Sequence, residues 1–141
     1  MKAGVTPKAY LGRCYHFAAS HRLHSDAYDK TRNRDVYGKC NNPHGHGHNY
    51  TVEVVVSGPV DAVTGMVCDL AELDAFANKK MLAVFDHMNL NTLSNFAHQV
   101  PTTENLCIEI YRIFQAGFRD AKLERVRVEE TGNNSFEYAG E

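Results

Sequence analysis

The sequence lacks the features of several large protein classes. It has no basic or acidic tract, and its 15 Lys and Arg against 17 Asp and Glu leave a formal charge of −2. Neither a nucleic-acid-binding tail nor an acidic interaction arm is therefore expected. Apolar runs such as residues 54–56 are far shorter than the roughly 20 residues that cross a bilayer, and the N-terminal segment has no apolar core. We expect no membrane span and no signal peptide.

The cysteines also argue against a fold held together by disulfide bonds. There are four of them, and no two form a Cys-x-x-Cys pair: Cys14, Cys40, Cys68 and Cys107. Such wide spacing in a chain of this size favours a reduced, cytoplasmic protein. No repeat, low-complexity tract or long linker divides the 141 residues, so residues 1–141 are expected to form one domain with its own core.

Hydrophobic periodicity predicts four strands and two helices. Alternation of period two predicts strands over residues 9–22, 47–57, 123–131 and 135–139. In the first strand this places Tyr15, Phe17, Ala19 and His21 on one face. Residues 26–37 are polar and are expected to form a short helix or a loop.

Both predicted helices have capping residues. Asp69 can cap the first, whose apolar stripe is Leu70, Leu73, Ala77, Met81 and Val84. After a loop over 86–101, Thr102 or Thr103 can cap the second helix, which ends near Gly117. The order strand, strand, helix, helix, strand, strand predicts an α+β domain with an antiparallel sheet and two helices on one face.

Histidine is abundant, and its placement points to a metal. Eight histidines occur, three of them in the stretch HGHGH at 44–48. Residues two apart in a strand point to the same side, so His46 and His48 share a face and the glycines leave space beside them. Imidazole is a favoured zinc ligand, and His21 at the end of the preceding strand can be the third. Three protein ligands leave one position open, as a catalytic zinc requires.

Other interpretations remain open for the same residues. His21 can be a core histidine with satisfied hydrogen bonds, and His44 is better explained as a solvated loop residue than as a ligand. A non-catalytic zinc module would close its site with a fourth ligand, His44 or Cys40. A zinc hydrolase would need a carboxylate base as in HExxH, which is absent. We expect His16, His24 and His98 to be structural or solvent-facing.

Three further groups can carry acid–base chemistry. A zinc ion and Lys39 can lower the pKa of Cys40, making it a general base, a nucleophile or a ligand. Asp86 can orient the adjacent His87. Glu130 ends an alternating apolar face and should point inward, where it needs either a salt-bridge partner or a ligand with paired N–H donors.

The sequence resembles the 6-pyruvoyl-tetrahydropterin synthase family from about residue 10 to its end. The stretches that carry the resemblance are FAASHRL at 17–23, GKCNNPHGHGHNY at 38–50, TGMVCDLAEL at 64–73, DHMNL at 86–90, PTTEN at 101–105, EETGNN at 129–134 and YAGE at the terminus. The resemblance implies a four-stranded antiparallel sheet with two helices on one side. Three such subunits would close a twelve-stranded barrel, and two trimers would form a homo-hexamer with active sites between subunits.

The resemblance also implies roles for individual residues. The zinc (Zn²⁺) ligands would be His21, His46 and His48, the catalytic cysteine Cys40, the acid–base pair Asp86 and His87, and the pterin anchor Glu130, with Thr103 and Glu104 completing the pocket. The implied substrate is 7,8-dihydroneopterin triphosphate, and the products are 6-pyruvoyl-tetrahydropterin and triphosphate on the route to tetrahydrobiopterin. Arg22, Lys39 and Arg34 are unranked candidates for holding the triphosphate.

A sister enzyme, 6-carboxy-tetrahydropterin synthase of the queuosine pathway, shares the implied fold, zinc site and substrate. Five residues lie between Cys40 and His46, as in the biopterin-pathway enzymes, whereas the sister group typically has a tighter spacing. The spacing therefore favours the biopterin branch. The sequence has no GxGxxG or P-loop pattern, in agreement with a reaction that needs no nucleotide cofactor.

Overall fold

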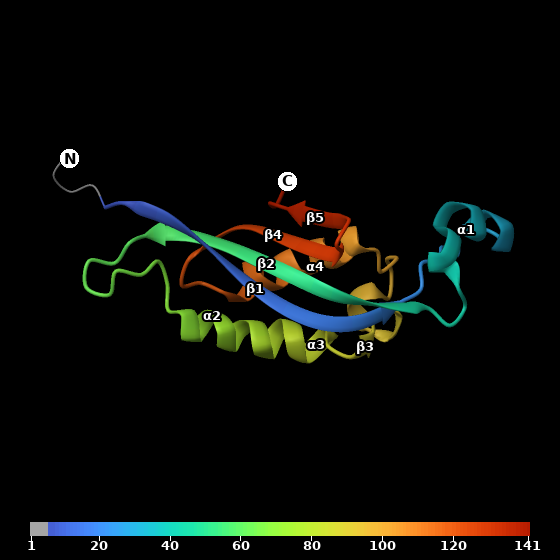
Figure 1. Ribbon diagram of the computed structural model, residues 1–141, viewed down its shortest axis with the longest axis horizontal. Helices are drawn as coiled ribbons and strands as arrows, with labels where there is room; N and C mark the ends of the chain where they lie inside the picture. The colour runs from blue at the N-terminus through green and yellow to red at the C-terminus, as the bar shows by residue number, and fades with distance from the viewer. Residues whose placement is uncertain (1–5) are drawn as a thin grey trace.

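A long twisted sheet forms one layer of the molecule, and helices cover one of its faces (Figure 1). The computed structural model describes residues 6–141. The four predicted strands are β1 (Lys8–His21), β2 (His46–Pro59), β4 (Lys122–Thr131) and β5 (Asn134–Tyr138). The pairs β1–β2, β2–β4 and β4–β5 are all antiparallel, as expected.

The sheet nevertheless has five strands and is mixed, which corrects the prediction of a purely antiparallel four-stranded sheet. The fifth strand, β3 (Met88–Asn89), lies in the segment predicted as a loop and pairs in parallel with β1 beside Ala19 and Ser20. Two residues are too few to produce an alternating pattern, so periodicity could not predict β3. This short strand fixes the adjacent segment against the edge of β1.

One face of the sheet forms the core. The four β1 side chains predicted to share a face are all buried: Tyr15, Phe17, Ala19 and His21. On β2 the buried partners are Tyr50, Val52, Val54 and Val56. The opposite face, with His16, Ala18 and Asn49, is not covered by any helix of the described chain (Figure 1). The sheet therefore has a packed face that ends in histidines and a second face that is open in the single chain.

The helices begin at the predicted caps. The side chain of Asp69 accepts from the backbone N–H groups of residues 71 and 72 at the start of α2 (Leu70–Ala77). Thr102 caps α4 (Thr103–Gly117) by accepting from Asn105, which leaves the hydroxyl of Thr103 free for another partner. A short polar helix, α1 (Lys30–Tyr37), occupies the segment predicted as helix or loop. No helix among residues 6–141 has both the length and the apolar character needed to span a bilayer.

The first predicted helix is interrupted by a π turn. After α2 comes the π turn η2 (Asn78–Leu82), followed by α3 (Ala83–Phe85). Leu73, Ala77, Met81 and Phe85 are fully buried at intervals of four residues. Such spacing drifts around a regular α-helix of 3.6 residues per turn, and the wider π turn corrects the drift. As a result Phe85 fills the core position predicted for Val84, which is only partly buried. The remaining short turns are η1 (Gly38–Asn41), η3 (Leu90–Thr92) and η4 (Ser94–Phe96).

Leu73 provides a test of this core. Its side chain is 0% exposed, so Leu73→Ala is expected to lower the free energy of unfolding by about 3 kcal/mol through lost apolar burial and a cavity. Urea unfolding at a fixed protein concentration measures the change. Val63→Ala is the control, because Val63 is 94% exposed and should cost less than about 0.5 kcal/mol. Equal effects of the two variants would contradict the assignment of the core.

Candidate metal centre and active site

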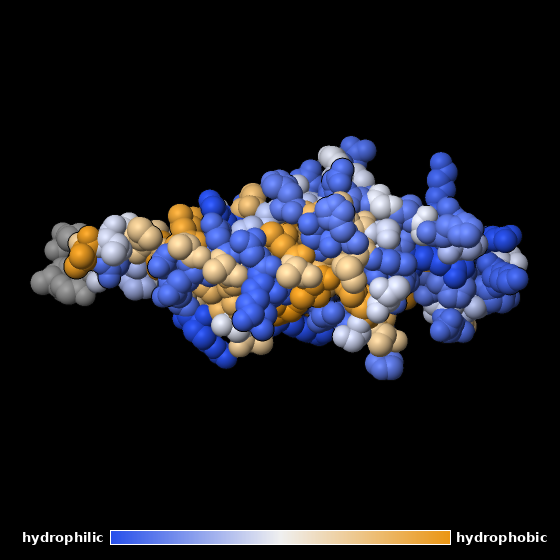
Figure 2. Space-filling model, turned by 90° about the horizontal axis from the view of Figure 1, so that it is seen from below, coloured by the Kyte–Doolittle hydropathy of each residue, from blue (hydrophilic) through white to orange (hydrophobic). Residues whose placement is uncertain are grey.

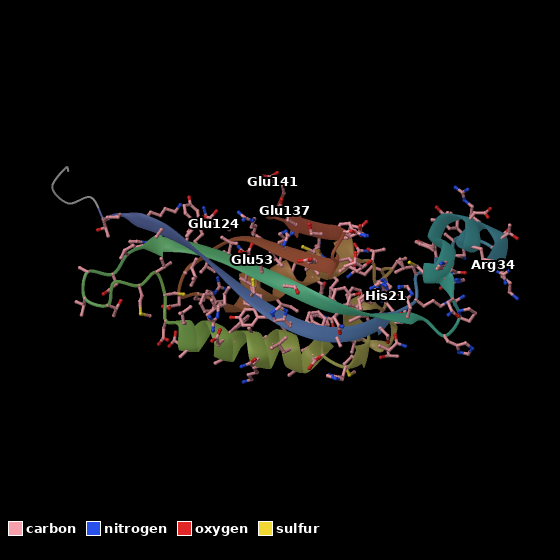
Figure 3. The ribbon with its side chains drawn as sticks, in the orientation of Figure 1. His21, Arg34, Glu53, Glu124, Glu137 and Glu141 are labelled. Atoms are coloured by element: carbon pink, nitrogen blue, oxygen red, sulfur yellow. The ribbon has the colours of Figure 1, made fainter. Side chains whose placement is uncertain are left out.

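The three predicted metal ligands lie together where β1 ends and β2 begins. In the antiparallel register His21 pairs with His46, and Ala19 pairs with His48. The side chains of His21, His46 and His48 therefore belong to the packed face of the sheet. Figure 3 labels His21 at this end of the sheet. Alternation along two adjacent strands is thus sufficient to gather the three imidazoles.

The distances among the imidazoles suit a shared ion. One ligand atom from each histidine lies within 4.8 Å of the other two, and this group could hold a metal ion. The Nε2 atoms of His21 and His46 are 3.1 Å apart. Two nitrogens bound to one tetrahedral zinc at its usual bond length would lie about 3.3 Å apart. The rings are close to mutually perpendicular, with interplanar angles of 77°, 83° and 89°.

The hydrogen bonds and the burial of the histidines also fit a metal. His21 Nδ1 donates to the carbonyl oxygen of Pro101 at 2.8 Å, which leaves the lone pair of Nε2 facing the group. His46 Nδ1 and His48 Nε2 are buried without any hydrogen-bond partner. Burial lowers the pKa of both His21 and His48, so both imidazoles are neutral at neutral pH. Neutral imidazole is the form that binds metals.

The group has three members in the described part of the chain, and neither alternative fourth ligand belongs to it. His44 is exposed in the loop before β2, as the sequence predicted. Cys40 is half-buried and also lies outside the group. An ion held by these histidines would therefore keep a free coordination position. This arrangement is typical of catalytic rather than structural zinc.

A carboxylate lies beside the histidines. Glu130 is on β4, its side chain is 16% exposed, and its Oε1 lies 3.7 Å from His48 Nε2. Its Oε2 accepts a hydrogen bond from the hydroxyl of Thr103, the group left free because Thr102 caps the helix. No Lys or Arg within residues 6–141 pairs with Glu130, which weighs against the alternative of an internal salt bridge. The carboxylate is inward-facing, as predicted, and without a permanent cationic partner.

Cys40 belongs to the same region, but its environment differs from the prediction. It lies on η1, and its carbonyl accepts from the backbone N–H of Leu23 at 2.8 Å. Burial and, to a smaller extent, the carboxylate of Glu130 raise the pKa of the Cys40 thiol. Lys39 was expected to lower this pKa, yet its side chain is exposed and is not among the groups that shift it. Within residues 6–141 the surroundings of Cys40 therefore favour the thiol over the thiolate.

Asp86 and His87 are in contact, but one chain does not bring them to the histidine group. His87 Nδ1 lies 2.9 Å from Asp86 Oδ1, and Asp86 Oδ1 also accepts from the backbone N–H of Ala18 at 3.0 Å. His87 has a φ of 60°, an uncommon conformation for a residue other than glycine. The hollow beside His87 is lined by Ala18 and Asn49 from the open face of the sheet. The pair therefore lies over the face opposite the one that carries the three histidines.

Two further findings concern residues around the site. Glu104 is exposed in the first turn of α4, where a negative charge interacts favourably with the helix dipole, and it is not hydrogen-bonded to Glu130. Tyr50 was not predicted as a site residue, although its hydroxyl lies 3.4 Å from His21 Nδ1. The alternation of β2 could have predicted this position, because Tyr50 is the next residue after His46 and His48 on the same face of the strand.

The fold and the site together define an α+β protein with three histidines that could hold a metal ion and an acceptor carboxylate beside them. The chain belongs to the 6-pyruvoyl tetrahydropterin synthase family, whose model matches residues 10–141.

Individual relatives agree with this membership over nearly their whole lengths. A protein from Poecilia reticulata called 6-pyruvoyl tetrahydrobiopterin synthase is 43% identical over 133 residues, covering 94% of this chain and 90% of that protein. The Homo sapiens protein of the same name is 42% identical over 135 residues, covering 95% and 93%. The structure of Caenorhabditis elegans 6-pyruvoyl tetrahydropterin synthase superimposes with a TM-score of 0.91 at 38% identity, covering 96% of this chain and 98% of that one.

Proposed function

We propose that this chain is a zinc-dependent 6-pyruvoyl-tetrahydropterin synthase, a cytoplasmic carbon–oxygen lyase of tetrahydrobiopterin biosynthesis. It would convert 7,8-dihydroneopterin triphosphate to 6-pyruvoyl-tetrahydropterin and inorganic triphosphate. The observation that carries the proposal is the three-histidine group, which has no fourth protein ligand among residues 6–141, next to the carboxylate of Glu130, which pairs with no Lys or Arg of those residues. Identity above 40% to relatives of that name over nearly the whole chain supports the choice of substrate.

His21, His46 and His48 would hold the zinc ion. When bound, zinc supplies Lewis acidity toward the hydroxyl oxygens of the substrate side chain and so acidifies the neighbouring C–H bonds. The hydrogen bond from His21 Nδ1 to Pro101 would keep the imidazole oriented for this role.

Cys40 would act as the base that removes a proton from the substrate side chain. Because burial raises the pKa of its thiol in the chain alone, a cation at the three histidines is the group that would lower it. Loss of triphosphate from the side chain and proton shifts along it would then move electrons into the pterin ring. The reaction is an internal redox change, so no external hydride donor is required.

Asp86 and His87 would return protons during these shifts. Since the pair lies over the other face of the sheet, it would have to serve the metal centre of a neighbouring copy. This requirement supports the homo-hexamer, in which three subunits close a twelve-stranded barrel and two barrels stack. Closing a barrel would also pair the free sheet edge formed by β5.

Glu130 would bind the pterin ring by accepting two hydrogen bonds from its guanidine-like edge. Thr103, already hydrogen-bonded to that carboxylate, would hold it in place. Glu104 is the weakest member of the implied pocket, because it is exposed and is not hydrogen-bonded to Glu130. Its role in substrate binding would therefore require a rearrangement or a neighbouring copy.

Product analysis tests the proposal against its rivals. The zinc-loaded protein is incubated with 7,8-dihydroneopterin triphosphate, and the pterin and phosphate products are identified by mass spectrometry. We expect 6-pyruvoyl-tetrahydropterin and triphosphate. A 6-carboxy product with acetaldehyde would assign the chain to the queuosine branch instead. No conversion while zinc remains tightly bound would favour a non-catalytic zinc module and refute the proposal.

A further inference from the structure

A polar hollow of about 550 Å³ adjoins the metal centre but is not part of it. Its walls come from the segment that follows β1 and from the loop that precedes α4, and they include Arg22, His24, His98 and Pro101. Arg22 follows the ligand His21 directly, and Pro101 accepts the hydrogen bond from His21. Pro101 therefore lines the hollow and also contacts the histidine group through its hydrogen bond with His21.

Arg22 has a fixed backbone. Asn91 holds it from both sides, because its Oδ1 accepts from Arg22 N at 2.7 Å and its Nδ2 donates to Arg22 O at 2.9 Å. The guanidinium Nε donates to the carbonyl oxygen of Asn41, the residue after Cys40, at 3.2 Å. The Arg22 side chain thus connects η1, the turn that carries Cys40, to the wall of the hollow.

The terminal nitrogens of Arg22 have no anionic partner in the described chain. The residue is half-buried, and no carboxylate within residues 6–141 lies within ion-pair distance of its guanidinium. The acidic group of the hollow, Asp26, is solvated at its rim and lies 3.6 Å from His24. A guanidinium with Nε engaged still has two Nη groups whose geometry matches phosphate oxygens.

His24 adds a second donor whose orientation is fixed. Asn41 Nδ2 donates to Leu23 O at 2.8 Å and to His24 Nδ1 at 3.0 Å. Because His24 Nδ1 accepts this hydrogen bond, the ring proton of the neutral imidazole is on Nε2. His98, exposed in the opposite wall, lies across the hollow as a further imidazole.

We propose that Arg22, assisted by His24, binds the triphosphate of the substrate in this hollow. The inference rests on the proposed function, in which the triphosphate begins one carbon beyond the hydroxyl oxygens that the metal would bind. It also ranks the three cations that the sequence left equal. Arg34 is exposed on α1, beyond the end of the sheet where His21 lies (Figure 3), and Lys39 is exposed without a fixed side-chain contact.

Direct binding of inorganic triphosphate tests this subsite without turnover. The zinc-loaded protein is titrated by calorimetry with inorganic triphosphate and, separately, with 7,8-dihydroneopterin, which has no phosphate; metal content is matched among variants. We expect Arg22→Gln to raise the dissociation constant for triphosphate about 10- to 100-fold, since hydrogen bonds between charged groups are lost. Arg22→Lys should raise the dissociation constant less, because lysine keeps the positive charge but lacks the planar guanidinium with its paired N–H donors. Arg34→Gln is the control, with a change below about twofold expected for an exposed residue outside the hollow.

Each contrary result has a definite meaning. The subsite is refuted if wild-type protein does not bind triphosphate, or if Arg22→Gln binds it as well as wild type. The subsite would also be refuted if Arg22→Gln weakened binding of 7,8-dihydroneopterin as much as binding of triphosphate. Arg22 would then only position η1, the turn that carries Cys40. Failure of the proposed function looks different: wild-type protein would bind triphosphate through Arg22 yet convert no substrate.

Discussion

Replacing His48 with alanine is expected to reduce the zinc content from about one ion per chain to a small fraction and to abolish conversion of the substrate. Loss of an outer hydrogen-bond partner of a metal ligand typically weakens metal binding about 10- to 100-fold, so loss of a ligand itself should cost at least about 100-fold. Elemental analysis after dialysis against a weak chelator measures the metal, and circular dichroism confirms that the variant is folded.

His44→Ala is the matched control for this variant. His44 belongs to the same HGHGH stretch but is exposed and lies outside the three-histidine group. It should keep full zinc content and full activity. Retention of zinc by His48→Ala together with its loss in His44→Ala would overturn the ligand assignment.

Changing Cys40 to alanine should lower the rate of conversion about 10³-fold, within the range contributed by a positioned general base. The zinc content should stay at the wild-type level, because the thiol is not a member of the histidine group. Binding of phosphate-free 7,8-dihydroneopterin should also persist. Single-turnover kinetics and elemental analysis on the same sample separate the loss of chemistry from the loss of metal.

Cys14→Ala serves as the control, since Cys14 is an exposed free cysteine on β1 and should be dispensable. Loss of zinc in Cys40→Ala would make Cys40 a fourth ligand and favour a structural zinc site. Activity within tenfold of wild type would show that another group removes the proton.

The grouping of the three histidines was predictable from sequence because it depends on strand alternation alone. His21 on β1 and His46 and His48 on β2 all lie on the same face of the sheet. The antiparallel pairing of the two strands brings the end of β1 beside the start of β2. The inward direction of Glu130 followed from the same rule on β4. In Figure 2 apolar side chains gather along the middle of the molecule, where the sheet and the long helices lie, and polar side chains surround α1. This distribution agrees with the apolar periodicity of the strands and helices and with the polar sequence of α1.

The irregular features were not predictable, for reasons of length and environment. β3 has two residues, and the π turn has five, so neither repeats often enough to leave a periodic signal. Asp86 and His87 are adjacent in sequence and do interact, but the face they occupy depends on β3. The raised pKa of Cys40 depends on burial by distant segments, which the local residue Lys39 does not reveal.

The π turn has a consequence for how the segment that carries Asp86 and His87 can vary among related chains. Each residue added to or removed from an α-helix rotates everything after it by about 100° around the axis. Asp86 and His87 come immediately after α3, so the five residues Asn78–Leu82 determine the angle at which the pair leaves the helix. Because the π turn accommodates one extra residue, a single-residue deletion within it would regularise the helix and leave Phe85 in the core and Asp86 beside Ala18. A deletion in α2 or α3 would instead rotate both residues. Single-residue deletions should therefore be better tolerated within the π turn than in α2 or α3, where they would rotate Phe85 and Asp86.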